Sequence, residues 1–281
     1  MGRAAIRRAI AVLTFLAPVV LAPSAQAGPW ALGKGRFYTK LSFQHLRSTE
    51  LAQPDGTLFD IPTFRRTEAS VYGQVGLSDR IDLYTNVPLL RSADLDDQPD
   101  ELGPETGFGD LQIGLQAQFA RRGRWVFAVR GTLQFPTGDE TRADGLLPTG
   151  SGAWEAEGLF GAGLSFARGK GYGYLEVGHQ HRGSGLRDTF LYNLQVGWNV
   201  GPRVTLAWNL RGVEPWNQTP GAGAAGSFVG VGDRTTYGIT GPTAILKLAK
   251  HWGLQLDYDR QFHAKNLAKG PTFRGGISFA R

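Results

Sequence analysis

Most of the chain alternates apolar with polar or small residues in stretches of ten to fourteen residues. In one stretch Trp125, Phe127 and Val129 fall on one face, while Arg130 and Thr132 fall on the other. Because successive side chains of a β-strand point to opposite faces, this period of two predicts strands. Strands of this length are long for a soluble sheet but suit a tilted strand that crosses a bilayer. The pattern therefore predicts a transmembrane β-barrel.

Twelve strands are predicted in this way. They cover residues 36–46, 66–77, 80–91, 108–119, 124–136, 153–166, 171–182, 188–199, 203–213, 235–248, 251–262 and 271–280. An even number lets an antiparallel barrel close with both termini on one side. The predicted fold class is therefore all-β, a 12-stranded antiparallel up-and-down transmembrane β-barrel. Residues 57–64 also have strand character, and we expect them to form a loop or a strand extension above the membrane.

The connections between these strands alternate in length. The short ones cover residues 78–79, 120–123, 167–170, 200–202 and 249–250, and the mostly longer ones cover 47–65, 92–107, 137–152, 183–187, 214–234 and 263–270. Outer-membrane barrels have short periplasmic turns and longer extracellular loops. We therefore expect the short set in the periplasm. The sequence leaves open whether the loop at 214–234 enters the lumen.

One strand departs from the alternation. Tyr237 and Ile239 would point outward on one parity, whereas Leu246 and Leu248 need the opposite parity to face lipid. A proline cannot donate a hydrogen bond to a neighbouring strand, and bulges absorb such slips. We therefore expect a bulge at Gly241-Pro242.

Aromatic residues fall into two rows on the outward parity. The periplasmic row contains Phe37, Phe119, Trp125, Phe166, Trp198, Trp252 and Phe279, and the outer row contains Phe135, Trp154, Phe190, Tyr192, Tyr237 and Phe273. Amphipathic rings gather at both membrane interfaces of such barrels. The two rows thus support the barrel independently of the strand count.

The amino terminus has the layout of a secretory signal peptide. Arg3, Arg7 and Arg8 precede an uncharged apolar run from 9 to 22, and Ala27 ends a small-residue cleavage site. The run is too short for a membrane helix, which needs about 20 apolar residues. We expect residues 1–27 to be a signal peptide cleaved near Ala27, residues 28–281 to form the barrel, and the bacterial outer membrane to be its location.

Charge and cysteine content exclude several classes. The formal charge is +6, from 30 basic and 24 acidic residues, and removing the three arginines of residues 1–27 lowers it to +3. That excess is small and scattered, so we expect no nucleic-acid partner. The absence of cysteine excludes disulfides, thiolate chemistry and cysteine-held zinc. We expect no cofactor and no metal, and we read His179 and His181 as an interfacial pair.

Strand parity also predicts the lining of the lumen. The charged residues expected inside are Lys40, Glu68, Asp82, Arg130, Glu155, Glu157, Glu176, Arg182, Arg211, Asp257, Asp259 and Arg274. Counting register across the connections sets Arg182 beside Glu155 and Glu157, and Arg274 near Asp259. Such pairs can brace the wall by neutralising buried charge, or they can constrict the pore and set its ion preference.

Several short elements resemble those of an outer-membrane family. Tyr72 to Leu83 reads YGQVGLSDRIDL and leads to Val87-Pro88, and Gly107 to Leu111 reads GFGDL. Pro136 to Asp139 (PTGD) and Leu147 to Gly150 (LPTG) then flank the third outer loop. This order resembles the family known as the MetA pathway of phenol degradation, over roughly residues 66–213. The resemblance implies an outer-membrane channel linked to uptake of aromatic or other apolar compounds, and it supplies no catalytic residues.

The function that these observations predict is a passive outer-membrane channel for small solutes, including aromatic or other apolar compounds, through a narrow polar lumen. Its expected partners are outer-membrane lipid, lipopolysaccharide and a small-molecule solute; the oligomeric state stays open. A barrel with only structural or surface-contact roles is one alternative. An outer-membrane lipid hydrolase is another, with His181 as base and Ser184 as the nearest serine, but their spacing is poor for catalysis. We expect no enzymatic activity.

The predicted outer loops contain apolar residues, which are unexpected in segments exposed to solvent. They are Leu51, Leu58, Phe59, Ile61, Phe64, Leu146, Leu147, Trp216, Phe228 and Val229. Loops that fold over the mouth and pack on one another would explain them. A capture site for an apolar solute is the other interpretation.

Overall fold

The structure, a computed structural model, describes residues 28–97, 105–139, 148–216 and 235–281. The expected signal peptide lies outside the described residues, as do most of the 214–234 loop and the apolar loop residues Leu146, Leu147, Phe228 and Val229. In the part of the chain that is described, no helix is long and apolar enough to span a membrane.

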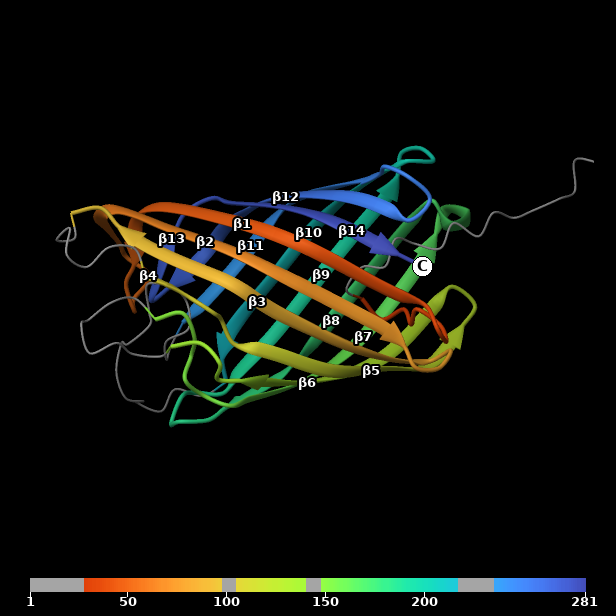
Figure 1. The fold of residues 1–281 in the computed structure, drawn as a ribbon, viewed down its shortest axis with the longest axis horizontal. Helices are drawn as coiled ribbons and strands as arrows, with labels where there is room; N and C mark the ends of the chain where they lie inside the picture. The colour runs from red at the N-terminus through yellow and green to blue at the C-terminus, as the bar shows by residue number, and fades with distance from the viewer. Residues whose placement is uncertain (1–27, 98–104, 140–147, 217–234) are drawn as a thin grey trace, which may run out of the picture.

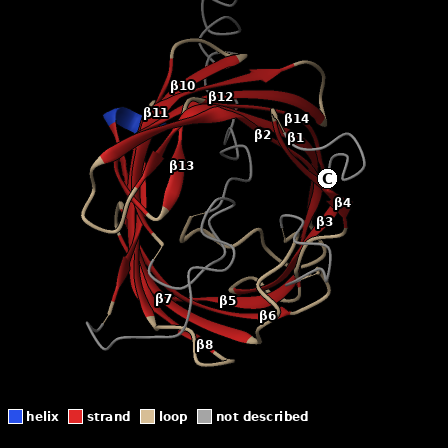
Figure 2. Ribbon diagram, turned by 90° about the vertical axis from the view of Figure 1, so that its left-hand side faces the viewer, coloured by secondary structure: helices blue, strands red, loops and turns tan. Residues whose placement is uncertain are grey.

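Twelve long antiparallel strands form a closed barrel (Figures 1 and 2). They are β1 Phe37–Ala52, β2 Leu58–Gly76, β3 Ile81–Leu95, β5 Leu111–Arg122, β6 Trp125–Phe135, β7 Glu155–Phe166, β8 Gly171–Arg182, β9 Thr189–Asn199, β10 Val204–Pro215, β11 Thr236–Lys247, β12 Trp252–Lys265 and β14 Thr272–Ala280. Each pairs with its neighbours along the chain, and β1 pairs with both β2 and β14, which closes the barrel. The predicted 12-stranded fold is confirmed.

Two short strands and one short helix complete the described elements. At the loop end of the barrel, β4 (Glu105–Gly107) pairs with β3, and β13 (Leu267–Lys269) pairs with β1. At the opposite end, η1 (Ala167–Gly169) forms the turn between β7 and β8. The strand character of residues 57–64 is a strand extension, because β2 begins at Leu58 and pairs with β1 as far as Ala52. The first outer connection is therefore only residues 53–57.

The period of two in the sequence becomes an outside and an inside. On β6 Trp125, Val129 and Leu133 are half exposed on the outer surface, whereas Val126 and Ala128 are buried. Rings of the expected periplasmic row also meet, since Phe279 stacks on Phe37 at 5.5 Å. Because an outward face of this kind is apolar, it suits lipid.

The expected parity slip in β11 is wrong. Gly241 and Pro242 keep their register with Asn209 and Trp208 of β10, so odd-numbered residues point inward along the whole strand. Tyr237 and Ile239 therefore line the interior, and Tyr237 does not belong to the outer aromatic row. The register shift lies instead between Gly238 and Ile239, opposite an extra residue in β12. A proline in a β-ladder loses one hydrogen bond, and here that loss did not require an inserted residue.

Candidate functional site: the barrel interior

The interior opens into a chamber of about 520 Å³ at the loop end. Six of the twelve charged residues predicted inside line it: Glu68, Glu155, Arg182, Arg211, Asp259 and Arg274. Arg182 Nε donates to Glu155 Oε1 at 3.0 Å, which is the pairing that the register count expected. Asp259 Oδ2 accepts from both Arg211, at 2.6 Å, and Arg274, at 3.3 Å. These carboxylates are thus held by guanidinium groups rather than left free in the chamber.

Two further arginines line the chamber that are not among the predicted lining residues. Arg66 and Arg91 both line it, and Arg91 Nη2 lies 2.8 Å from Glu68 Oε2. Arg91 faces inward because the pairing of β2 with β3 shifts between Ala69 and Ser70, which leaves Leu89 as an extra residue in β3. A bulge of this kind reverses the alternation beyond it. Strict parity along β3 therefore assigns Arg91 to the wrong face.

Deeper in the barrel, Arg130 lies between two glutamates. Its guanidinium nitrogens are 3.7 Å from Glu157 Oε1 and 3.6 Å from Glu176 Oε1. Its Cζ also lies 5.7 Å from the ring centre of Tyr84, and Asn193 donates to Glu176 at 2.8 Å. An arginine so placed is oriented by several weak contacts at once, which fixes its position in the lumen.

We call the part of the lumen around Arg130, Glu157 and Glu176 the deeper zone. Its other predicted cation is Lys40. Its Nζ lies 3.4 Å from Gln255 Oε1, and Gln255 Nε2 donates to both oxygens of Asp257 at 3.0 Å. Asp257 also accepts a hydrogen bond from Thr243. The lysine and this aspartate are therefore joined through an amide side chain, and no direct ion pair between them occurs in the described residues.

Charge is distributed unevenly between the two zones. The chamber lining has five arginines against four carboxylates, because Asp110 joins Glu68, Glu155 and Asp259. The deeper zone has two predicted cations, Lys40 and Arg130. It has four predicted acids, which are Asp82, Glu157, Glu176 and Asp257. A solute moving inward would therefore pass from a slightly positive into a negative environment.

A segment before β1 fills part of the other end of the barrel. Leu32 N donates to Asp82 Oδ2 at 2.9 Å, and Gln74 Nε2 donates to the same oxygen at 2.8 Å. Gln116 Nε2 donates to the carbonyl of Trp30 at 3.2 Å. Asp82, completely buried, thus anchors this segment to the inner wall. Sequence parity placed Asp82 inside, but no pattern in residues 28–35 showed that they would occupy the lumen.

The start of the segment rests against the opposite strands. Trp30 makes edge-on contacts with Tyr172 and Tyr174, each at 6.1 Å between ring centres. Pro29 is fully buried, and a Cβ on Gly163 would lie only 2.7 Å from its Cγ. The glycine at 163 therefore makes room for the segment. Residues 28–34 bridge β2, β3 and β5 to β7 and β8, and so narrow the lumen at this end.

The elements that carry the family resemblance tie the outer loops together. Asp110 Oδ1 accepts from Gly138 N at 3.0 Å, and its Oδ2 accepts from Ser151 N at 2.7 Å. A Cβ on Gly138 would approach Gly150 Cα to 2.8 Å, so the two glycines permit close packing. Arg91 Nη1 donates to the carbonyl of Thr149 at 2.6 Å. We call these contacts among Asp110, Gly138 and residues 149–151 the loop base. The loop base therefore holds the chamber residue Arg91 in place.

We expect Asp110→Ala to destabilise the loop base. The change leaves two backbone donors without their acceptor, at a cost of about 1–3 kcal/mol. Thermal unfolding of the purified barrel, followed by its heat-modified gel mobility, should show a lowered transition. Asp139→Ala is the control, because this nearby carboxylate is exposed and makes no side-chain hydrogen bond within the described part of the chain. Equal transitions for both variants would show that Asp110 is not the support of this loop base.

The arrangement of side chains around His181 does not support the lipid hydrolase alternative. His181 Nδ1 lies 2.9 Å from Asp188 Oδ1, and His179 Nε2 lies 3.3 Å from the other oxygen. In residues 148–216 no hydrogen bond joins His181 to a serine hydroxyl, as a nucleophile and base would require. The described residues likewise contain no group of three or more side chains placed to hold a metal.

The apolar loop residues partly pack on one another. Phe64 is buried with Leu46, Ala93 and Ala268, at the point where β1, β2, β3 and β13 meet. By contrast, Trp216 is exposed at the outer rim, 5.2 Å from the His179 ring. The packing interpretation thus accounts for Phe64.

Comparison with known proteins gives a family and a fold. The family model described as "Putative MetA-pathway of phenol degradation" matches residues 57–274. No curated protein sequence matches the chain.

Several solved structures share the architecture. The outer membrane channel COG4313 from Pseudomonas putida F1 aligns with a TM-score of 0.67 at 18% identity, over 92% of this chain and 98% of that one. The NanC porin aligns with a TM-score of 0.51 at 10% identity, over 85% and 98%. The CymD monoaromatic hydrocarbon channel aligns with a TM-score of 0.50 at 7% identity, over 89% of each chain. At these identities the likeness concerns the fold, which is that of outer-membrane channels.

Proposed function

The chain belongs to the family described as "Putative MetA-pathway of phenol degradation", and from this premise we propose that it is a passive channel of the bacterial outer membrane for small solutes. In this proposal residues 1–27 direct export and are removed, and the mature barrel has no enzymatic activity. The twelve charged residues predicted inside, together with Arg66 and Arg91, line its lumen.

The main support for the proposal is the shape of the barrel interior. The closed barrel encloses a chamber of about 520 Å³ with a mixed polar and apolar lining, and residues 28–34 narrow the barrel at its other end. Small barrels are filled by side chains and large porins leave water channels, so twelve strands suit a narrow passage. Solute size would then be limited by the segment rather than by the wall.

The lining of the chamber favours a solute that is both apolar and anionic. Five guanidinium groups share the space with Leu46, Phe64, Val213, Tyr237 and Leu267. Arginine stacks on flat rings and binds carboxylates through two parallel hydrogen bonds. Small aromatic acids would meet both needs.

Swelling of proteoliposomes tests this proposal. We expect the reconstituted barrel to admit benzoate faster than a neutral sugar of larger cross-section, because the narrow lumen selects by size. The chamber attracts the carboxylate, but the negative deeper zone opposes it, so size makes the larger contribution. Gluconate, an anion without an aromatic ring, separates charge from shape as a control. If no solute causes swelling above empty liposomes, the barrel is structural and the channel proposal fails.

A further inference from the structure

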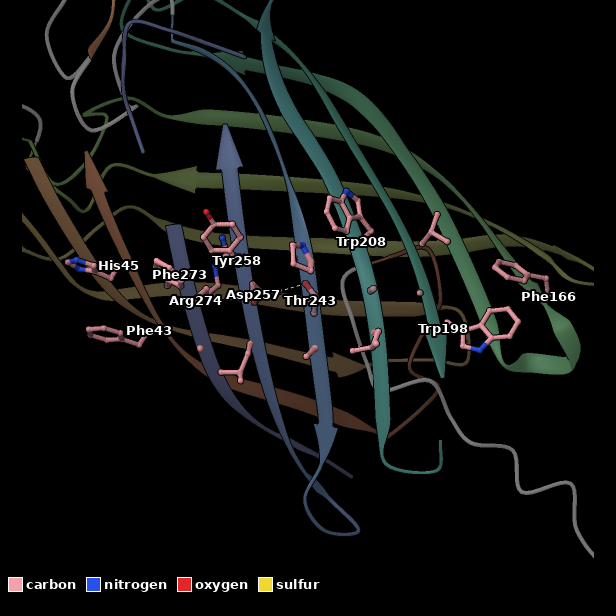
Figure 3. A pocket seen from close by; sticks show the side chains of 18 residues that line it. Phe43, His45, Phe166, Trp198, Trp208, Thr243, Asp257, Tyr258, Phe273 and Arg274 are labelled. Atoms are coloured by element: carbon pink, nitrogen blue, oxygen red, sulfur yellow. Dashed lines mark hydrogen bonds between the residues drawn. The ribbon is translucent and has the colours of Figure 1, made fainter. Parts of the chain in front are cut away.

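The outer surface of the barrel has an apolar hollow of about 900 Å³ across β9, β10, β11, β12, β14 and β1, with Phe166 of β7 at its edge (Figure 3). Its floor is made by small or flat residues, Gly275, Ala244 and Pro242, which come from neighbouring strands. Larger outward side chains surround it: Phe43, Leu206, Trp208, Leu256, Tyr258 and Phe273. All six are at least 37% exposed, so no other part of the described chain covers them.

A cationic pocket of about 620 Å³ adjoins this hollow on the side of the outer loops. It is lined by Arg47, Arg260 and Lys269, and Tyr258 contributes to both spaces. The strand register explains the arrangement. His45, Phe273 and Tyr258 pair in one row across β1, β14 and β12. Arg47 and Arg260 lie two residues further along, where Arg47 N donates to the carbonyl of Pro271.

The cations lie at the height of the outer membrane interface. Phe37, in the periplasmic aromatic row, precedes Arg47 by ten residues on β1. Ten residues at about 3.4 Å, on a strand tilted by about 40°, rise about 26 Å, which is close to the ~25 Å apolar band of such barrels. The hollow therefore lies within the hydrocarbon region, and the cationic pocket lies at the headgroups.

Within the described residues none of Arg47, Arg260 and Lys269 lies within ion-pair distance of a carboxylate. The only acid that lines the pocket is Glu50, opposite Lys269 in register, although Arg47 also lies close enough to Asp96 to favour the charged form of that carboxyl. Nearby Arg65 differs, because its guanidinium binds Asp94 at 3.1 Å and Asp96 at 2.5 Å. That contact holds the pKa of Asp96 below its usual value. Among the residues that line the pocket, the three cations thus exceed the one acid by two charges.

We propose that the hollow and the cationic pocket together bind a phosphorylated glycolipid of the outer leaflet. The phosphate of its lipid A would contact Arg47, Arg260 and Lys269, and its acyl chains would lie in the hollow beside Gly275. Arginine forks suit phosphate oxygens, and basic pockets at this depth recognise lipid headgroups. The excess positive charge selects an anionic headgroup over a second copy of this barrel or a neutral solute. The site is independent of whether the lumen conducts.

Native mass spectrometry of the delipidated full-length mature barrel in detergent tests the proposal. Diphosphoryl lipid A is titrated against monophosphoryl lipid A and phosphatidylglycerol. We expect diphosphoryl lipid A to bind tightest, by about tenfold, because it presents the most phosphate charge to the cations. The double variant Arg47→Gln/Arg260→Gln should lose that preference.

Filling the hollow tests the acyl-chain part separately. A Cβ on Gly275 would meet only Leu256 Cδ2, at 3.7 Å, so Gly275→Val should fold and occupy the space. We expect its affinity for lipid A to fall several-fold. Gly131→Val is the matched control, because Gly131 also faces outward with its nearest atom at 4.0 Å. Arg121→Gln/Arg203→Gln, at exposed positions near the opposite rim, controls for charge.

Each outcome decides the proposal. Loss of preference in the arginine variant and weaker binding in Gly275→Val, with both controls like the wild type, support it. Equal binding of all three lipids by the wild type would show a general lipid surface and overturn it, as would dimers in place of lipid adducts. If the arginine variant does not assemble, the lipid series on the wild type and Gly275→Val still decide the question.

Discussion

Deletion of residues 29–34 should raise the single-channel conductance several-fold. The segment bridges the inner wall from Asp82 to Tyr174, so its removal widens the lumen at this end. The groups that it leaves behind are polar, and water can solvate them, so we expect the barrel to remain folded. Gly28 is kept so that the expected cleavage site is intact. Conductance in planar bilayers at fixed salt concentration measures the effect.

A point variant separates anchoring from occupancy. Asp82→Ala removes the acceptor of Leu32 N but leaves the segment in place, so we expect fluctuating openings rather than a uniformly larger current. Asp79→Ala is the control, since Asp79 accepts from Lys34 N at 3.3 Å in an exposed position outside the lumen. If the deletion conducts like the wild type, the narrowest point lies elsewhere in the barrel.

Reversing the charge at Glu157 should change ion selectivity. Glu157 and Glu176 flank Arg130, and Glu157→Lys shifts the deeper zone by two positive charges. Fixed charge in a narrow, low-dielectric passage governs which ions enter. We expect the cation-to-anion permeability ratio to fall by about threefold or more. Reversal potentials across a potassium chloride gradient give this ratio.

Two further variants serve as controls for the shift in ion selectivity. Glu157→Gln should produce a smaller shift of the same sign, because it removes one charge and adds none. Asp55→Lys reverses a charge on the exposed 53–57 turn, where a screening length of about 10 Å at 0.1 M salt keeps it from affecting the lumen. Unchanged reversal potentials for Glu157→Lys would contradict a pore-lining role for this residue.

The sequence determined the strands and their faces where the alternation runs without interruption. β6 shows this directly, since Val126 and Ala128 are buried and Val129 is exposed as parity requires. The prediction from strand parity is wrong where the backbone departs from a regular strand. The extra residue Leu89 turns Arg91 inward, while Pro242 leaves the parity of β11 unchanged. Whether a given proline or leucine shifts a register depends on the neighbouring strand, which a one-dimensional pattern does not contain.

The barrel follows from the amino-acid sequence, because a period of two and a closed hydrogen-bond ladder follow from local geometry and solvent. The use of the interior follows only from the three-dimensional arrangement of the strands. That arrangement placed Leu32 on Asp82, set Arg130 between two glutamates, and brought Arg47 beside Arg260 across the closing strands. These contacts join residues far apart in the chain, and only the register and closure of twelve strands bring them together.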